Sequence, residues 1–406
     1  MRILHITGQK PNSTGSGVYI SGLIDNLRNL GHSQCVIAGM DIKDERKCFE
    51  KEIKCYPLMY NSDKIPFSVL GMSDIMPYES TKYKDLNKEM MQALKKEFIS
   101  LLKKVIDEFK PDIIISNHLY LITAFVVESV KDIKVIGLCH GTCLRQLKNI
   151  DLEKEYIISN IRKLDKIFVL QEAQREDVIN LFNLKEEKVI VIGSGYDNDI
   201  FYFKNYKKSN NVINITFAGK VCKSKGLKSL LLSLNKLKYP NKSIVLNIAG
   251  SGSDYVIYEE MLQISEECKY KVNFLGRLNH EDLSELFNKS QLFILPSFYE
   301  GLPVVVLEAL ACGCEVIVSD ISGVKKWMGN KINKSGNIDY IKLPNMKSAG
   351  VPIKSELNEF EEELYYTIDK KINKIFTKGC NDIVNMEDKT WLGLAKRVDE
   401  IIDNII

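Results

Sequence analysis

Short runs of aliphatic and β-branched residues recur along the first half of the chain, and they alternate with longer segments whose apolar positions repeat at helical spacing. Each run is continuous, which is typical of parallel strands that are buried on both faces. The runs predict strands at 2–6, 34–38, 112–116, 134–139, 166–170 and 188–192. The intervening segments predict helices at about 17–30, 84–109, 120–131, 154–164 and 172–182. The segment 40–80 is interrupted by Pro57, Pro66 and Pro77 and predicts no element.

A second series of the same kind begins after the polar stretch 204–211. It predicts strands at 212–218, 243–249, 271–275, 291–295 and 315–318, with helices at about 225–237, 254–268, 280–289 and 303–312. Alternation of strands and helices implies right-handed crossovers and a parallel sheet. We therefore expect an α/β protein with two doubly wound, Rossmann-like domains.

The two series predict an N-terminal domain at 1–195 and a second domain at 196–385. The last stretch, 386–406, has the pattern of an amphipathic helix, which we expect to pack back on the N-terminal domain. Ligands of doubly wound sheets bind outside the carboxyl ends of the strands. Two such domains facing one another would place those ends across a cleft.

Composition and charge exclude several classes of function. The 406 residues carry 56 basic and 53 acidic side chains, a balance that argues against a dedicated nucleic-acid binder. The cysteines form no repeated pair with metal-ligand spacing, so no structural zinc site is expected. Residues 1–7 resemble a strand and not a signal peptide, and no apolar run approaches the ~20 residues that span a bilayer. A cytoplasmic protein is therefore expected.

The helix expected at 84–109 is rich in lysine and could touch anionic lipid at the inner face of the membrane. Its glutamates and aspartates dilute that signal. A solvated helix face is the better interpretation of this segment.

The stretch 296–313 (PSFYEGLPVVVLEALACG) is the most informative part of the chain. It follows an apolar strand and opens a helix, and Pro303 suits the first helical turn, where a missing N–H costs nothing. The free amides of that turn form an anion site suited to a diphosphate. Glu300 and Glu308 would lie roughly 10 Å apart along the helix axis, about the distance from a sugar to a ribose across a pyrophosphate. Alternatively, both carboxylates lie on solvated surfaces, although the apolar neighbours of Glu308 argue against this.

This stretch resembles the Glu-x7-Glu motif of glycosyltransferase family 4, a GT-B family of retaining enzymes. Three further segments follow in the order of that family. The segment 217–226 (FAGKVCKSKG) is similar to its phosphate-binding segment, 247–252 (NIAGSG) to its next strand and glycine turn, and 274–278 (FLGRL) to the segment that meets the base. The resemblance covers nearly the whole chain, is strongest over 213–320, and implies a GT-B fold.

Carried over to this chain, the resemblance implies that Glu300 binds the hydroxyls of the donor sugar and that Glu308 binds the hydroxyls of the ribose. Lys220 and Lys225 would hold the diphosphate and stabilise the leaving nucleotide. The other donor-binding residues that it implies are Gly250, Arg277, Gly301, Leu302, Pro303 and Val304. The family usually has arginine at position 220, so Lys220 keeps the charge but loses the bidentate fork. The region 325–380 also departs from the family's pattern.

In the first domain, the segment 12–18 (NSTGSGV) follows the first strand and precedes a helix. It resembles the family's first glycine loop, in which the backbone at Gly15 and Gly17 comes close to donor or acceptor. His118 and His140 follow two predicted strands. His118 resembles a catalytic position near the transferred sugar, and His140 resembles one on the acceptor side. A lone histidine is usually structural, but two at strand carboxyl ends favour a site.

The resemblance therefore predicts transfer of a sugar from a nucleoside diphosphate sugar, with UDP as the expected nucleotide. The expected acceptor is a saccharide, a lipid-linked molecule or a small molecule. The resemblance also predicts retention at the anomeric carbon, no metal and no cofactor. The lysine-, asparagine- and isoleucine-rich composition is typical of an AT-rich bacterial genome, in which such enzymes often build glycans. Two alternatives remain open at this point: a sugar-nucleotide epimerase on the same fold, and a nucleotide-sugar-binding protein without catalysis.

Overall fold

The computed structural model describes residues 1–44, 53–73, 76–206, 208, 211–252, 254–348 and 350–406. The chain divides into two compact units, Met1–Gly195 together with Trp391–Ile406, and Tyr196–Thr390. The first boundary lies between Gly195 and Tyr196. Unit 2 extends to Thr390, and the last helix, α13 (Trp391–Asp403), begins after it. Residues 386–390 therefore belong to unit 2 and not to the C-terminal helix.

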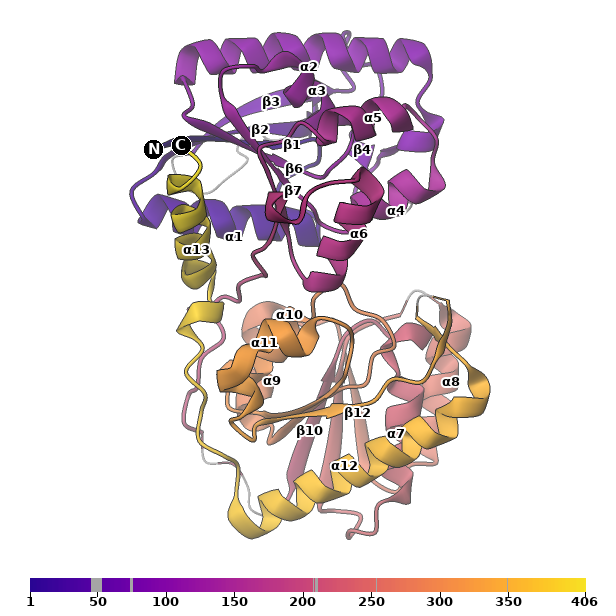
Figure 1. Cartoon of the computed structure of the whole chain (residues 1–406). Coiled ribbons are helices and arrows are strands. Elements are labelled where there is room, and N and C mark those ends of the chain that lie inside the picture. The colour runs from indigo at the N-terminus through magenta and orange to yellow at the C-terminus, as the bar shows by residue number, and fades with distance from the viewer. Residues whose placement is uncertain (45–52, 74–75, 207, 209–210, 253, 349) are drawn as a thin grey trace. The chain divides into compact units, whose positions relative to one another are not determined.

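Unit 1 contains a seven-stranded parallel sheet in the order β3-β2-β1-β6-β7-β8-β9 (Figure 1). The strands are β1 (Arg2–Thr7), β2 (Ser33–Asp41), β3 (Lys54–Tyr60), β6 (Ile113–Asn117), β7 (Lys134–Leu138), β8 (Lys166–Val169) and β9 (Val189–Val191). The direction of strand order reverses between β1 and β6. A reversal of this kind is the switch point at which ligands bind in doubly wound sheets.

Helices cover both faces of this sheet, which explains why its strands are continuously apolar. Ile3 packs into the cluster with α1 (Gly15–Asn29) and α13, whereas its neighbour Leu4 packs into the opposite cluster. That second cluster includes residues of α2 (Lys88–Phe109), α3 (Leu121–Ser129), α4 (Thr142–Asn149), α5 (Lys154–Ile161) and α6 (Glu172–Phe182). The last helix of the chain thus completes the core of unit 1.

The segment 40–80, for which the sequence predicts no element, contains the edge strand β3. Pro57 lies inside this strand, and proline is tolerated there because an edge strand need not donate every ladder hydrogen bond. A small parallel pair follows, β4 (Leu70–Gly71) with β5 (Thr81–Lys82). Residues 45–52 and 74–75 of this segment lie outside the described part of the chain.

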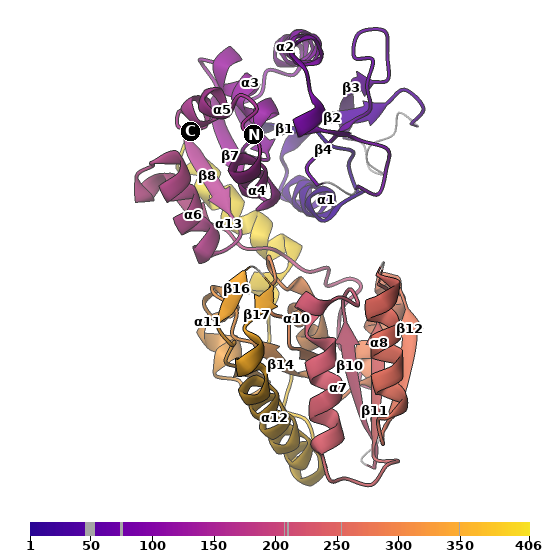
Figure 2. The same cartoon turned by 90° about the vertical axis from the view of Figure 1, so that its right-hand side faces the viewer.

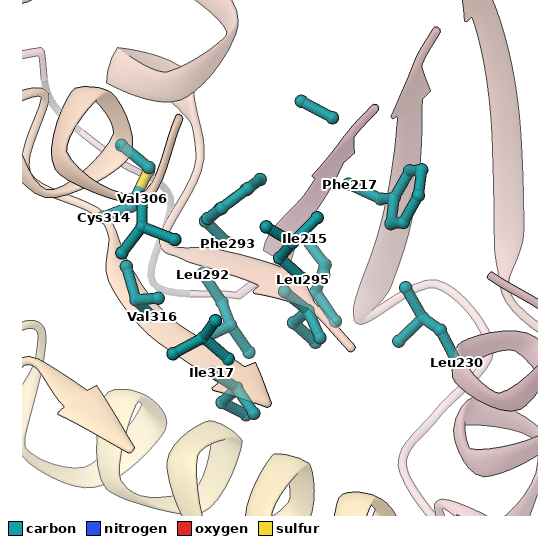
Figure 3. Packing of buried hydrophobic residues seen from close by; sticks show 14 of the residues in the cluster. Ile215, Phe217, Leu230, Leu292, Phe293, Leu295, Val306, Cys314, Val316 and Ile317 are labelled. Atoms are coloured by element: carbon teal, nitrogen blue, oxygen red, sulfur yellow. The ribbon is translucent and has the colours of Figure 1, made fainter. Parts of the chain in front are cut away.

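Unit 2 contains a six-stranded parallel sheet in the order β12-β11-β10-β13-β14-β15. Its strands are β10 (Ile213–Ala218), β11 (Ile244–Ala249), β12 (Lys271–Gly276), β13 (Leu292–Leu295), β14 (Glu315–Ser319) and β15 (Ile338–Ile341). The helices are α7 (Leu227–Lys236), α8 (Tyr255–Glu266), α9 (His280–Lys289), α10 (Val304–Ala311), α11 (Val324–Asn333) and α12 (Leu357–Lys378). Figure 3 shows Ile215, Leu292 and Ile317 packing with their neighbours in its core.

The region 325–380, which the sequence leaves unassigned, forms most of α11, then β15, a hairpin of β16 (Met346–Ser348) and β17 (Val351–Pro352), and the long helix α12 (Figure 2). Charged residues are buried here. Lys371 of α12 is 4% exposed and its ammonium group lies 2.9 Å from the carboxylate of Glu315, which is 1% exposed. Buried charges interrupt the apolar pattern from which a helix is predicted, and this explains why the sequence shows no clear element.

Candidate active site

In unit 2, the loops that follow β10 and β13 meet at the switch point of the sheet. The amide of Phe298 donates to the carbonyl oxygen of Ser224 at 2.8 Å. Gly226 has φ +67°, and a Cβ placed on it would lie 2.0 Å from the carbonyl oxygen of Pro296. Only glycine fits this crossing, so the sequence Lys225-Gly226 places a lysine beside the loop of Glu300.

Lys225 and Glu300 form an ion pair across the two loops. The Lys225 ammonium group donates to Oε2 of Glu300 at 2.6 Å, and the hydroxyl of Ser297 donates to Oε1 at 2.7 Å. The side chains are 21% and 12% exposed, so the pair is largely shielded from water. Both carboxylate oxygens are engaged, which holds Glu300 in one orientation. The structure thus brings together two of the residues that the sequence singles out.

Lys220 and Arg277 are exposed at the carboxyl ends of β10 and β12. Neither takes part in a hydrogen bond or ion pair of the described residues, and the structure does not bring them into the Lys225–Glu300 pair. Their charges are available to a ligand at this edge of the sheet. Both remain predicted donor-binding residues.

Three glycine turns lie at the carboxyl ends of β10, β11 and β12. The amide of Gly219 donates to Ala249 at 2.9 Å, and the amide of Gly250 donates to Gly276 at 2.7 Å. A Cβ on Gly250 would lie 1.8 Å from the carbonyl oxygen of Gly219. These turns bring backbone close to backbone without side chains between, which leaves room for a ligand to approach.

Helix α10 begins beside Glu300, and its first turn is not capped by a side chain, because Pro303 occupies the N-cap position. Gly301 is exposed, and a Cβ on it would meet nothing within 4 Å. Leu302 and Val304 flank the proline at the helix start. The amides of Val304 and Val306 donate to the carbonyl oxygens of Leu302 at 2.9 Å and Pro303 at 3.0 Å, so it is chiefly the positive end of the helix dipole that makes this position suitable for an anion.

Glu308 lies one turn further along α10 and is half-buried. Burial, and secondly the negative charge of Asp197, raise the pKa of this carboxyl group to about 7. A carboxyl group with a perturbed pKa near a helix start is a candidate for ligand binding.

In unit 1, the loop after β1 is held by local hydrogen bonds. The hydroxyl of Thr14 accepts from the amide of Gly17 at 3.1 Å and caps α1. A Cβ on Gly17 would lie 2.8 Å from the amide nitrogen of Asn12, whereas one on Gly15 would meet nothing within 4 Å. Gly17 therefore shapes the loop, and Gly15 leaves its backbone open to a ligand.

His118 and His140 lie side by side after β6 and β7, with ring centroids 4.8 Å apart. Nε2 of His140 lies 3.1 Å from Oδ1 of Asn117. Burial, followed by the charge of His118, holds the pKa of His140 well below its usual value. His140 is therefore neutral at physiological pH.

Gln9 connects the loop to the histidines, and the sequence did not identify it. Its Oε1 accepts from the hydroxyl of Ser16 at 3.1 Å and lies 3.1 Å from Nε2 of His118. Because an amide oxygen can only accept, Nε2 of His118 carries a proton. The one available signal was the position of Gln9 two residues after a strand, and a glutamine carries no chemistry that marks it as functional.

Among the described residues, no group of three or more histidine, cysteine, aspartate or glutamate side chains is placed to hold a metal ion. Metal independence remains a prediction. No helix within the described ranges has both the length and the apolar character to cross a membrane.

Two protein-family models match the chain. The model described as Glycosyltransferase Family 4 matches residues 13–200, and Glycosyl transferases group 1 matches residues 198–338. Together they cover most of both units.

An uncharacterized glycosyltransferase of Methanocaldococcus jannaschii is 31% identical over 198 residues, which is 46% of this chain and 50% of that protein. Glycogen synthase of Mycobacterium tuberculosis is 25% identical over 40% of this chain and 39% of its own length. The chain therefore matches half or less of the length of these curated relatives.

Two solved structures share the fold over the whole chain. A lipopolysaccharide outer core galactosyltransferase, WaaB, has a TM-score of 0.63 at 16% identity, and the match covers 100% of both chains. An Anabaena protein, HepE, in complex with UDP-glucose, has a TM-score of 0.61 at 12% identity and the same coverage. With two doubly wound parallel sheets the chain has the GT-B fold, and a glycosyltransferase family model matches part of each unit.

Proposed function

We propose that this protein transfers a sugar from a nucleoside diphosphate sugar, with UDP as the expected nucleotide, to an acceptor hydroxyl with retention at the anomeric carbon. The observation that carries the proposal is the Lys225–Glu300 ion pair beside the uncapped start of α10, at the switch point of unit 2. The Anabaena protein of the same fold that binds UDP-glucose supports the choice of nucleotide. We assign the reaction to glycan or glycoconjugate synthesis.

In this proposal the diphosphate lies at the start of α10 and is held by the positive end of the helix dipole, Lys225 and Lys220. The bond between the anomeric carbon and the diphosphate oxygen breaks, and the nucleoside diphosphate leaves with the bonding electrons. Fixed positive groups stabilise the growing charge on the leaving oxygens. The acceptor oxygen bonds to the anomeric carbon on the same face, and its proton passes to the departing phosphate.

Once the donor is bound, the Lys225 ammonium group would contact both Glu300 and the diphosphate. Its ammonium group already donates to Glu300 at 2.6 Å and has further hydrogens for a phosphate oxygen. Glu300 would accept hydrogen bonds from sugar hydroxyls while Lys225 contacts the diphosphate. The pair would therefore fix the sugar relative to its leaving group, which is the orientation effect that an active site uses to lower a barrier.

Glu308 would accept hydrogen bonds from the ribose hydroxyls, further along α10 from the reacting bond. In unit 1, we assign His118 to the transferred sugar and His140 to the acceptor side. His140 is neutral, so it can both donate and accept a hydrogen bond to a hydroxyl. A neutral partner suits an acceptor that must release its own proton.

A panel of nucleotide sugars tests this proposal. A donor at about 100 times its Kd should stabilise the protein by about 2.7 kcal/mol and raise its Tm visibly. The donor so identified should then release nucleoside diphosphate in the presence of mixed saccharide acceptors. Release of free nucleotide with an epimerised sugar, and no acceptor product, would indicate an epimerase. Saturable binding without any release of nucleotide would indicate a binding protein, and either result would contradict the proposal.

A further inference from the structure

The hairpin of β16 and β17 packs against the candidate site of unit 2, and the proposed mechanism does not use it. It lies at 346–352, beyond residue 338, where the family-model matches end. It connects β15 to the start of α12 (Figure 2). The resemblance to family 4 therefore assigns no role to this hairpin.

The tip of the hairpin lies against both loops that form the Lys225–Glu300 pair. Gly350 is buried and has φ +74°. A Cβ placed on it would lie 2.9 Å from Cβ of Ser224 and 3.3 Å from Cβ of Tyr299. Ser224 directly precedes Lys225, and Tyr299 directly precedes Glu300. One residue of the hairpin thus packs against both loops, one position before each charged side chain.

The base of the hairpin is anchored to the body of unit 2. The amide of Ile353 donates to the carbonyl oxygen of Asn345 at 2.8 Å. The backbone and side-chain amides of Asn345 donate to the two carboxylate oxygens of Glu356 at 2.7 and 3.0 Å. Met346 packs against the core of the unit. Because its base is fixed, the hairpin holds its tip in place against the loops.

The loop of Glu300 has one further support on this side of unit 2. The ring of Phe298 packs on the ring of Phe360 of α12, with centroids 5.2 Å apart. More than half of the Tyr299 side chain is exposed, so the contact at Gly350 is a principal restraint on the next position of the loop. Closely packed contacts transmit a displacement and do not absorb it. A shift of the hairpin tip would therefore change the spacing of the two loops.

We propose that the β16–β17 hairpin is a positioning element of the donor site, and that Gly350 holds the two loops at the spacing at which Lys225 and Glu300 meet. The hairpin contributes no group to the reaction. Any Cβ at position 350 would push against both loops, so the contact requires glycine. The orientation of the donor sugar relative to its leaving group then depends on the hairpin. In this last respect the inference rests on the proposed function.

Gly350→Ala tests the inference, and Gly379→Ala is its matched control in the same unit. Gly379 has φ +76°, close to that of Gly350, but a Cβ on it would meet nothing within 4 Å. Both variants therefore introduce similar backbone strain, and only Gly350→Ala presses on the loops. Adding Ser224→Gly to Gly350→Ala removes the Cβ that lies 2.9 Å away and should rescue the variant.

The first readout needs no ligand. Lys225→Ala and Glu300→Gln are introduced separately and together into each background, and a double-mutant cycle gives their coupling in Tm. We expect a coupling of about 2–4 °C in the wild type and at most about half of it in Gly350→Ala. Gly379→Ala and the rescued variant should keep the full coupling. A merely structural glycine would lower Tm in every combination and leave the coupling unchanged. That result, or a wild type without coupling, would overturn the inference.

Glu356→Ala gives a second test that adds no atom to the contact. It removes the carboxylate that anchors Asn345 at the base of the hairpin. The coupling between Lys225 and Glu300 should fall here as well, because the tip loses its fixed support. If Gly350→Ala does not fold, this variant decides alone, and an unchanged coupling overturns the inference.

Calorimetric titration of UDP-glucose is the second readout, and it separates this inference from the proposed function. Gly350→Ala should raise the Kd about fivefold or more, and Gly379→Ala should leave it unchanged. If the wild type binds UDP-glucose and Gly350→Ala binds it equally tightly, the inference alone fails. If the wild type binds no nucleotide sugar, the proposed function fails, and the coupling in Tm still decides whether the hairpin positions the pair.

Discussion

At the scale of single residues, the Lys225–Glu300 pair combines a structural and a functional role, and a double variant can separate them. Lys225→Ala should cost about 2–4 kcal/mol of transition-state stabilisation, because a fixed positive charge at the leaving group is lost. It should also lower Tm, because Glu300 is left charged and 12% exposed without its partner. Adding Glu300→Gln should restore Tm but not turnover. Measurement of kcat/KM and Tm for both variants checks this, and recovery of turnover in the double variant would contradict it.

The raised pKa of Glu308 makes the stability of the folded protein depend on pH. Its folded pKa of about 7 lies above the ordinary value of 4.5, so the folded state holds the proton more tightly than the unfolded state. Stability is therefore lost as pH rises from about 4.5 through 7, and Glu308→Gln should gain up to about 3 kcal/mol over the wild type at pH 8 but little at pH 5. Thermal unfolding of both proteins at the two pH values measures the difference.

The same variant should bind donor more weakly, because the carboxylate is the proposed acceptor of the ribose hydroxyls. Wild-type affinity for UDP-glucose, whose diphosphate does not titrate near neutrality, should rise as pH passes upward through 7. Glu308→Gln should abolish this dependence, and Glu300→Gln, the matched control, should keep it while lowering kcat. If the affinity of the wild type does not depend on pH, the Glu308 carboxylate does not bind the ribose hydroxyls.

The limits of the sequence at this scale are visible in Gln9. Glu300, Lys225 and the two histidines carry groups whose chemistry attracts notice, and a motif surrounds them. Gln9 positions His118 through a contact between residues far apart in the sequence.

At the scale of elements, glycines at the loop crossings decide whether the site forms. Gly226→Ala would place a Cβ 2.0 Å from the Pro296 carbonyl oxygen at a residue with φ +67°. We expect it to separate the two loops, break the Lys225–Glu300 pair and raise the Kd for UDP at least tenfold. Gly301→Ala is the control, because its Cβ would meet nothing within 4 Å. Calorimetric titration of UDP into both variants measures the two Kd values. Equal affinities would show that the crossing of the loops does not organise the site.

Elements could be predicted where periodicity is regular. The buried strands of both sheets were predicted because apolar layers on two faces leave a continuous signal. The edge strand β3 and the helix α12 were not predicted, because β3 contains a proline and α12 buries Lys371 and Glu361 through paired contacts. Such pairings are set by the three-dimensional fold, and no local pattern records them.

At the scale of the whole molecule, both sheets reverse strand order at a switch point. The Lys225–Glu300 pair lies at the switch point of unit 2, and His118 follows β6 at the switch point of unit 1. Positive charge for the leaving group would come from Lys220, Lys225 and the start of α10. We therefore predict that turnover continues in excess EDTA at more than half of the untreated rate. Loss of turnover that Mn²⁺ or Mg²⁺ restores would require a metal in place of these groups.

The central claim is that the bond between the sugar and the diphosphate is broken and the sugar is transferred with retention. The most direct measurement is a time course of proton NMR on the enzyme with an α-linked UDP-sugar and a saccharide acceptor. The account predicts that the donor's anomeric signal decreases as free UDP and an α-linked product appear together, and that Lys225→Ala slows both by a factor of about 30 or more. An initial β-linked product, or a donor signal that never changes although the donor is bound, would contradict the account.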